Sequence, residues 1–336
     1  MVFNLPEIPK SKQYVDKMTP EQHAIMKCIN QENLSQEEEL NLKEAIEFYK
    51  ESFPKLKNIN LGVIKENEVK ELKKYLNKVF NFNITISNDI HFEVLFRVSF
   101  VREEFTEKGK VRDPKFLKYP PIEVVKDKGV YNRANTNEKT VFYGSFYENV
   151  AIRETKPIVG DRIIISTWRN ISGKPFNSYP IANTDVNNEG TQKATEAFKE
   201  TKGVNNPLFG KIMDLNLGFL ASEFVKDCEI KNEKRFEYLY SAYFADKILS
   251  PFNEDDPTPD IDFIIYPSVA WKHLHENVAI VPNSVDKKLK LIKVVEYSVA
   301  ETYYNQQIEK NEMPVKLDFI READWIENDL IIWEDE

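Results

Sequence analysis

The chain is poor in cysteine, in long apolar runs and in positive charge, and each shortage excludes a class of protein. Its two cysteines, Cys28 and Cys228, lack the Cys-x-x-Cys or Cys/His spacing of metal sites, so we expect both to be reduced and to act as small apolar residues. No stretch approaches the roughly 18 apolar residues that span a bilayer. Pro6 and Glu7 stand where a secretion signal needs an unbroken apolar core, so we expect a cytoplasmic protein without a membrane partner.

Acidic residues outnumber basic ones. The 336 residues include 46 Lys and Arg against 55 Asp and Glu, which gives a formal net charge of −9. Nucleic acids and anionic membranes bind cationic surfaces, so we expect neither as a partner, although a small basic pocket for a dinucleotide is compatible with this charge. The hydrophobic content of 41% and charged content of 30% are typical of a globular protein with one large domain or two ordinary ones.

The first part of the chain has the pattern of capped helices. Thr19 precedes Pro and Gln at helix-start spacing, and Ser35 with Glu38 forms a capping box ahead of an amphipathic segment at 36–52. A third segment, about 66–80, has apolar residues at helical spacing. We therefore predict a helical N-terminal region.

Apolar segments with strand character dominate after residue 83. They are 91–100, 139–145, 162–168, 262–268 and 277–282. Helical periodicity returns in an insert at about 186–250, and further strands are expected within 287–336. We predict an α+β fold in which residues 1–82 form the helical N-terminal region and residues 83–336 form the domain that contains the sheet.

Two arginines are candidates for binding an anion. Arg97 lies inside the strand segment 91–100, where an unpaired charge is costly, so it needs either an ion-pair partner or a phosphate gripped by the guanidinium fork. Arg133 lies in the polar turn YNRANTNEK together with Asn135. It is either an exposed turn residue or a second phosphate contact.

The segment FYGSFYENVAIRET combines a strand end with a helix start and contains Tyr143 and Glu154. The Tyr143 ring would stack on a flat heteroaromatic ring or fill the core. Ser145 and Glu148 have the spacing of a capping box, so we expect a helix that places Glu154 in its second or third turn. Glu154 is then either a functional carboxylate held by secondary structure or a solvated surface charge.

Ser268 follows the apolar strand DFIIYP at its C-terminal end, where sheet proteins often place ligand-binding groups; the alternative is a turn or N-cap hydroxyl. His273 and His275 follow closely, so a serine hydrolase that uses Ser268 is a second interpretation, although YPSVA is not the Gly-x-Ser-x-Gly elbow. The two histidines lack a third ligand at telling spacing, so no metal site is predicted.

These segments, taken in order, resemble the RES domain family, which is named for its Arg, Glu and Ser. The resemblance spans about residues 91–286 and includes LFRVS, NRAN, VFYGSFYENVAIRE, YPSV and ENVAIVP. The residues that match the family's pattern are Arg97, Arg133, Asn135, Tyr143, Glu154 and Ser268.

The resemblance implies an ADP-ribosyltransferase-like fold and cleavage of the bond between nicotinamide and ribose in NAD, which is then a substrate and not a cofactor. In this interpretation Arg97 and Arg133 hold the pyrophosphate, with Asn135 in the same substrate-binding turn. Tyr143 stacks near the nicotinamide, and Glu154 binds ribose hydroxyls and stabilises the positive charge of an oxocarbenium-like transition state.

The resemblance also implies roles for Ser268 and for partners. The hydroxyl of Ser268 would bond the nicotinamide ribose or amide, and water, phosphate or a protein side chain would accept the ADP-ribose. Family members include toxins of bacterial toxin–antitoxin pairs, which implies an antitoxin protein as a partner. The remaining alternative is a non-catalytic nucleotide-binding or interaction protein with the same fold.

Overall fold

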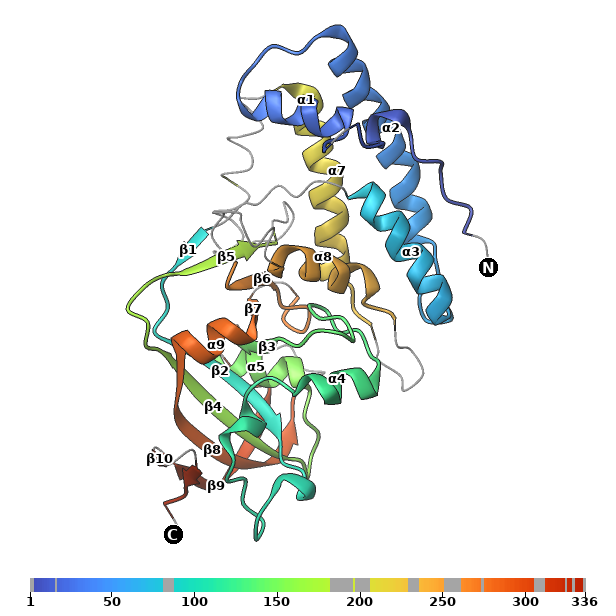
Figure 1. Cartoon of the computed structure of the whole chain (residues 1–336). Coiled ribbons are helices and arrows are strands. Elements are labelled where there is room, and N and C mark those ends of the chain that lie inside the picture. Colours follow the sequence, from blue (N-terminus) through green and yellow to red (C-terminus); the bar gives the residue numbers. More distant parts are fainter. Residues whose placement is uncertain are drawn as a thin grey trace.

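The computed structural model shows a group of helices stacked on a large, curved β-sheet (Figure 1). It describes residues 3–15, 17–80, 88–181, 196, 206–228, 236–250, 261–272, 275–304, 312–323, 325–327 and 330–334.

Five helices form the helical part. They are α1 (Pro20–Ile29), α2 (Gln36–Lys57), α3 (Glu66–Val79), α7 (Pro207–Phe224) and α8 (Leu239–Leu249). The predicted N-cap at Thr19 and the predicted capping box at Ser35 are confirmed, because Thr19 accepts a hydrogen bond from the Gln22 backbone at 3.2 Å and Ser35 accepts one from the Glu38 backbone at 3.2 Å. The second helix continues beyond the predicted segment, through Pro54 to its end.

The charge of Glu38 gives the first testable prediction. Hydrogen bonding to Lys27 and to the Ser35 backbone lowers the pKa of Glu38 to about 2. Because the folded pKa lies below the unfolded one, the charged form favours folding above about pH 5, and this contribution is lost as the pH falls towards 2. The pair is partly exposed, so we expect Glu38→Gln to lower the free energy of unfolding at pH 7 by at most about 1 kcal/mol.

Urea unfolding between pH 2 and 7 measures this effect. The difference between wild type and Glu38→Gln should vanish near pH 2, and the neighbouring variant Glu37→Gln should show no comparable loss. An unchanged acid dependence in Glu38→Gln would contradict the assignment.

The main sheet has nine strands in the order β1-β5-β6-β7-β3-β2-β4-β8-β9. Their bounds are β1 Asn88–Ile90, β2 Val94–Phe100, β3 Phe142–Ser145, β4 Arg162–Asn170, β5 Phe176–Pro180, β6 Phe263–Pro267, β7 Glu276–Ile280, β8 Leu289–Thr302 and β9 Val315–Ala323. Strands β5 and β6 pair in parallel, and the other neighbouring pairs are antiparallel.

Shorter elements complete the secondary structure of the described residues. They are α4 Ile122–Lys128, α5 Glu148–Thr155, α9 Pro282–Lys288, the 3-10 helices Lys10–Lys12, Glu103–Phe105 and Pro114–Leu117, and the hairpin of β10 Trp325–Glu327 and β11 Leu330–Ile332. Of these, α5 packs on β2, β3 and β7. Helix α5 therefore covers the centre of the sheet.

One hydrophobic core joins the helices to the sheet. It contains residues of α2, α7 and α8 together with Ile264, Tyr266 and Ala279 from β6 and β7. Helix α2 packs directly on α7, which begins 150 residues after α2 ends (Figure 1). The predicted boundary at residue 82 lies outside the described residues, and the division into two domains stays a prediction.

A buried polar cluster fixes the N-terminal segment to the helices. The Lys12 ammonium donates to Glu21 Oε2 at 2.6 Å, to the Tyr49 hydroxyl at 2.6 Å and to the Val79 carbonyl at 2.8 Å. The Tyr49 hydroxyl donates in turn to Glu21 Oε1 at 2.8 Å. The side chains of Lys12 and Glu21 are fully buried, and burial lowers the pKa of Lys12. All three ammonium protons thus have acceptors.

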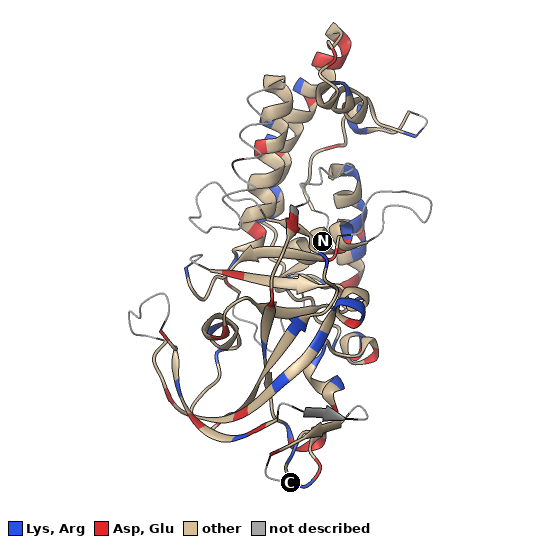
Figure 2. Cartoon of the chain, turned by 90° about the vertical axis from the view of Figure 1, so that its left-hand side faces the viewer, with Lys and Arg blue, Asp and Glu red and all other residues tan. Residues whose placement is uncertain are grey.

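A second buried charge lies on β8, between its neighbouring strands β4 and β9. Glu296 on β8 is fully buried, accepts a hydrogen bond from Arg162 Nε of β4 at 2.7 Å and lies 3.1 Å from Arg321 Nε of β9. Basic and acidic residues are interspersed along these outer strands (Figure 2). This arrangement satisfies the charge of Glu296 from both sides.

The predicted α+β class is confirmed, and every predicted strand segment contains a strand of the sheet. The C-terminal strands extend the main sheet, since β8 pairs with β4 and β9 with β8. Within the predicted insert, α7 and α8 are confirmed, whereas 186–195, 197–205 and 229–235 lie outside the described residues. Among the residues that are described, no helix has the length and apolar character needed to cross a membrane.

Candidate functional site

Tyr143 lies at the centre of the sheet, on β3 between β7 and β2. Its hydroxyl donates to Asn135 Oδ1 at 2.8 Å and accepts from the Ala134 backbone at 2.9 Å. Burial raises the pKa of Tyr143 well above its usual value, so the phenol is neutral at physiological pH. The next residue is Gly144, where a Cβ atom would come within 3.1 Å of the Phe96 carbonyl oxygen, so a side chain here would push β2 and β3 apart.

The two hydrogen bonds of the Tyr143 hydroxyl predict the effect of removing it. We expect Tyr143→Phe to lower the free energy of unfolding by about 1–3 kcal/mol, because it leaves the Ala134 amide without its acceptor and leaves Asn135 Oδ1 with only the longer bond from Asn132 Nδ2, at 3.3 Å. Urea unfolding measures the loss. Tyr243→Phe is a matched control, since the Tyr243 hydroxyl bonds Asn77 at 2.8 Å near the surface. Equal, small losses in both variants would contradict a structural role for the Tyr143 hydroxyl.

The polar turn before β3 is ordered by its own side chains. Asn135 is buried, and its Nδ2 donates to the carbonyls of Thr136 at 2.9 Å and Lys139 at 3.2 Å. Backbone bonds between Asn132 and Asn135 close the turn. Asn135 therefore holds the Tyr143 hydroxyl from a fixed position.

Arg133, in the same turn, is directed at the end of helix α7. Its Nη1 donates to the carbonyls of Phe224 and Lys226, the latter at 3.0 Å, and its Nη2 lies 3.3 Å from the Tyr238 hydroxyl. The guanidinium also lies over the Tyr238 ring, 4.9 Å from its centroid. Much of the hydrogen-bonding capacity of Arg133 is thus used within the protein, and a phosphate would have to share this cation with α7.

Arg97 is next to Phe96, whose pairing with Ser145 joins β2 to β3. Its Nη1 donates to the Tyr143 carbonyl at 2.8 Å, and its guanidinium lies 5.2 Å from the centroid of the Phe142 ring. The Nε atom is buried and has no hydrogen-bond partner among the described residues. Burial lowers the pKa of Arg97 to about 10, so it is a cation at neutral pH. The predicted structural ion pair is absent among the described residues, and a carbonyl takes its place.

Glu154 and Ser268 are joined directly. Glu154 lies in the last turn of α5, and Ser268 follows β6 and is fully buried. The Ser268 hydroxyl donates to Glu154 Oε1 and accepts from the Trp271 backbone at 3.3 Å, and the Ala270 amide lies 3.4 Å from the same carboxylate oxygen. The fold thus brings together two predicted residues that lie 114 positions apart.

The helix that contains Glu154 begins differently from the prediction. Helix α5 starts at Glu148, and its N-cap Tyr147 makes no side-chain cap. The predicted capping box at Ser145 is wrong, because the Ser145 hydroxyl donates to the Glu276 carbonyl of β7 at 2.9 Å. The same hydroxyl accepts from the backbone amide of the N-cap Tyr147 at 3.3 Å, not from that of Glu148 as a capping box requires, and Glu154 still falls in the second turn.

The predicted residues surround Tyr266 of β6, which the sequence analysis did not single out. Burial raises the pKa of Tyr266 well above its usual value, the nearby Tyr143 and Glu154 raise it further, and Arg133 opposes them. Arg97 likewise acts on the pKa of Tyr143. Direct contacts link the predicted residues in smaller sets. Arg97 and Asn135 both bond Tyr143, and Ser268 bonds Glu154. The Arg133 guanidinium lies 6.0 Å from the centroid of the Tyr266 ring. The position of Tyr266 on β6, two residues before Ser268, was the available signal.

The serine hydrolase interpretation finds no support in the geometry. The Ser268 hydroxyl donates to Glu154, and it is the backbone carbonyl of His275 that accepts a bond, at 2.7 Å, from the Ser268 amide. The His275 ring packs against Trp271, with centroids 5.2 Å apart. His273 lies outside the described residues. Within the described chain no group of three or more His, Cys, Asp or Glu side chains is arranged to hold a metal ion.

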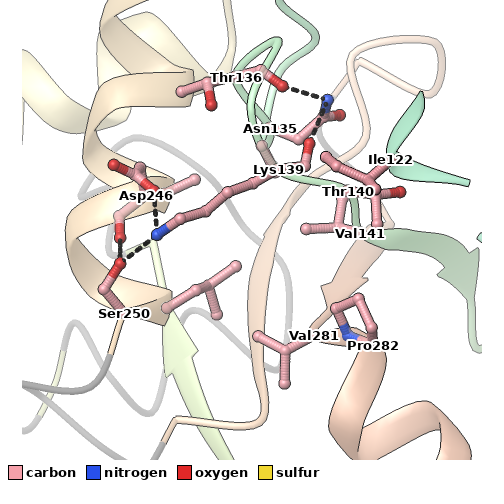
Figure 3. A pocket seen from close by; sticks show the side chains of 13 residues that line it. Ile122, Asn135, Thr136, Lys139, Thr140, Val141, Asp246, Ser250, Val281 and Pro282 are labelled. Atoms are coloured by element: carbon pink, nitrogen blue, oxygen red, sulfur yellow. Dashed lines mark hydrogen bonds and ion pairs between the residues drawn. The ribbon is translucent and has the colours of Figure 1, made fainter. Parts of the chain in front are cut away.

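A cavity of about 300 Å³ adjoins the turn that holds Tyr143 (Figure 3). It is lined mostly by apolar residues of the turn, α4, α8 and the start of α9, and Asn135 is part of its wall. At its rim Lys139 bonds Asp246 at 2.5 Å and Ser250 at 2.6 Å (Figure 3). Of the six predicted residues, Asn135 is the one that lines this cavity.

Comparisons with protein-family models, with curated proteins and with solved structures found no match to this chain.

Proposed function

We propose that this protein consumes NAD by cleaving the bond between nicotinamide and ribose. The observation that best supports the proposal is the hydrogen bond from the Ser268 hydroxyl to the Glu154 carboxylate, close to Tyr266, over whose ring the Arg133 guanidinium lies. A carboxylate among cations and hydroxyl groups suits a phosphorylated substrate that develops positive charge on its ribose.

The chemistry assigns each residue a task. The glycosidic bond of NAD breaks through an oxocarbenium-like transition state, and Glu154 stabilises the positive charge that develops on the ribose. Ser268 keeps the carboxylate oriented and bonds the nicotinamide ribose or amide. Arg97, whose Nε lacks a partner among the described residues, binds the pyrophosphate, with Arg133 as a second contact.

The proposal extends to the fold and to partners. We infer that the mixed sheet is an ADP-ribosyltransferase-like core in which NAD is the substrate and no further cofactor takes part. Water, phosphate or a protein side chain accepts the ADP-ribose. We further propose a cytoplasmic protein neutralised by an antitoxin.

Incubating the purified protein with NAD tests the proposal. Nicotinamide release, followed by chromatography, is the expected result, and the products identify the acceptor, because ADP-ribose marks water and ADP-ribose 1″-phosphate marks phosphate. A protein that binds NAD without releasing nicotinamide would instead be the non-catalytic alternative. If the wild-type protein did not bind NAD and did not release nicotinamide, the proposed function would be refuted.

A further inference from the structure

Asn277, the second residue of β7, has a buried side-chain amide whose N–H group lacks an acceptor in the described part of the chain. It is 4% exposed, and its Nδ2 has no acceptor among the described residues. Folded proteins satisfy most buried polar groups, since burying an amide without a partner costs free energy. Packing alone does not explain an asparagine here.

Its position in the sheet places it beside the candidate site. Asn277 is paired directly with Ser145 of β3 on one side and with Tyr266 of β6 on the other. Paired residues of antiparallel strands point to the same face, and so do residues two positions apart on one strand. Asn277 therefore shares a face with Tyr143, two residues before Ser145, and with Tyr266.

The same region contains a second unsatisfied donor. Trp271 is 4% exposed, and its Nε1 is buried without an acceptor among the described residues, while its backbone amide bonds the Ser268 hydroxyl. Helix α5, which contains Glu154, packs on β7, the strand of Asn277. Both unpaired groups are uncharged N–H donors, so they match an oxygen acceptor on a ligand.

We propose, on the basis of the proposed function, that Asn277 is a substrate-positioning residue whose Nδ2 donates to the carboxamide oxygen of the nicotinamide group. A carboxamide oxygen is a neutral acceptor, which suits an uncharged buried donor. The other polar groups of NAD have better-matched partners: the phosphate oxygens accept from Arg97 and Arg133, and the ribose hydroxyls donate to Glu154.

Asn277→Leu separates this role from a structural one. An apolar group of similar size removes an unsatisfied amide, so we expect the melting temperature to stay unchanged or rise by about 2 °C. We expect kcat/KM for NAD to fall at least about tenfold, because the free energy of one lost hydrogen bond corresponds to about a tenfold change. Asn216→Ala, which removes an amide that bonds the Ile212 carbonyl at 2.9 Å within α7, should leave kcat/KM unchanged.

An NAD analogue whose pyridinium ring lacks the carboxamide completes the test. Wild type and Asn277→Leu should cleave this analogue at the same rate, because the proposed bond does not exist in either. The proposal would be overturned if Asn277→Leu lost the same factor in kcat/KM on NAD and on the analogue. It would also be overturned if the variant had a lowered melting temperature and preferred NAD over the analogue as strongly as wild type does. Failure of the proposed function is seen separately: wild type itself would then neither bind nor cleave NAD, and the assignment of Asn277 would fall with it.

Discussion

Glu154→Gln is expected to reduce nicotinamide release from NAD by about 10²–10³-fold while leaving the fold intact. The substitution keeps the shape of the side chain and an oxygen that accepts from Ser268, and it removes only the negative charge. An uncharged amide does not stabilise the positive charge of an oxocarbenium-like transition state. The measurement is the initial rate of nicotinamide release at saturating NAD, because the loss should appear in kcat.

Helix α5 provides the matched control for this experiment. Glu148 begins the same helix, is partly buried, and has a pKa raised by burial. Glu148→Gln should therefore retain the wild-type rate of nicotinamide release if the loss in Glu154→Gln comes from the Glu154 carboxylate itself and not from removing any carboxylate of α5. Equal rates of NAD loss in wild type and Glu154→Gln, with both proteins folded, would refute the role of Glu154.

Lys12→Met is expected to lower the free energy of unfolding by about 3–5 kcal/mol, the largest stability loss that we predict. The substitution leaves the Glu21 carboxylate fully buried, with the Tyr49 hydroxyl as its remaining side-chain donor among the described residues. An uncompensated buried charge is far more costly than a missing surface pair. Urea unfolding followed by circular dichroism measures the loss.

Two further variants test the physical cause. Lys74→Met removes an exposed partner of Glu71, 2.8 Å away, and should cost less than about 1 kcal/mol. Lys12→Met combined with Glu21→Leu removes both buried charges and should recover much of the stability lost in the single variant. If Lys12→Met were no more costly than Lys74→Met, the cluster would not hold the N-terminal segment in place.

The predictable part of the fold was the part with local signals. Capping residues and helical periodicity located α1 to α3, and apolar runs located the longer strands. Strands β1 and β5 were missed because they are short, and β5 contains polar residues within FNSYP. Helix α9 was missed because PNSVDKK is too short and too polar to show periodicity. The order of the strands is set by tertiary contacts, for which the sequence carried no signal.

The candidate site shows the same division. Residue types and order were sufficient to select six side chains that the fold brings together in smaller sets. The partners of those side chains were not predictable. Arg133 bonds the end of α7, a helix more than seventy residues later, and the hydroxyl of Ser145 donates to a carbonyl of β7. Such bonds depend on where distant segments pack, and composition and spacing do not report that.

The packing of α2 on α7 has a consequence for synthesis of the chain. The apolar face of α2 includes Ile46, Tyr49 and Phe53, and α7 begins 150 residues after α2 ends. At roughly 5–20 residues per second, α2 leaves the ribosome on the order of ten seconds before its partner helix is made. During that interval part of its apolar face lacks its native cover, which makes this helix a natural binding site for chaperones on the nascent chain.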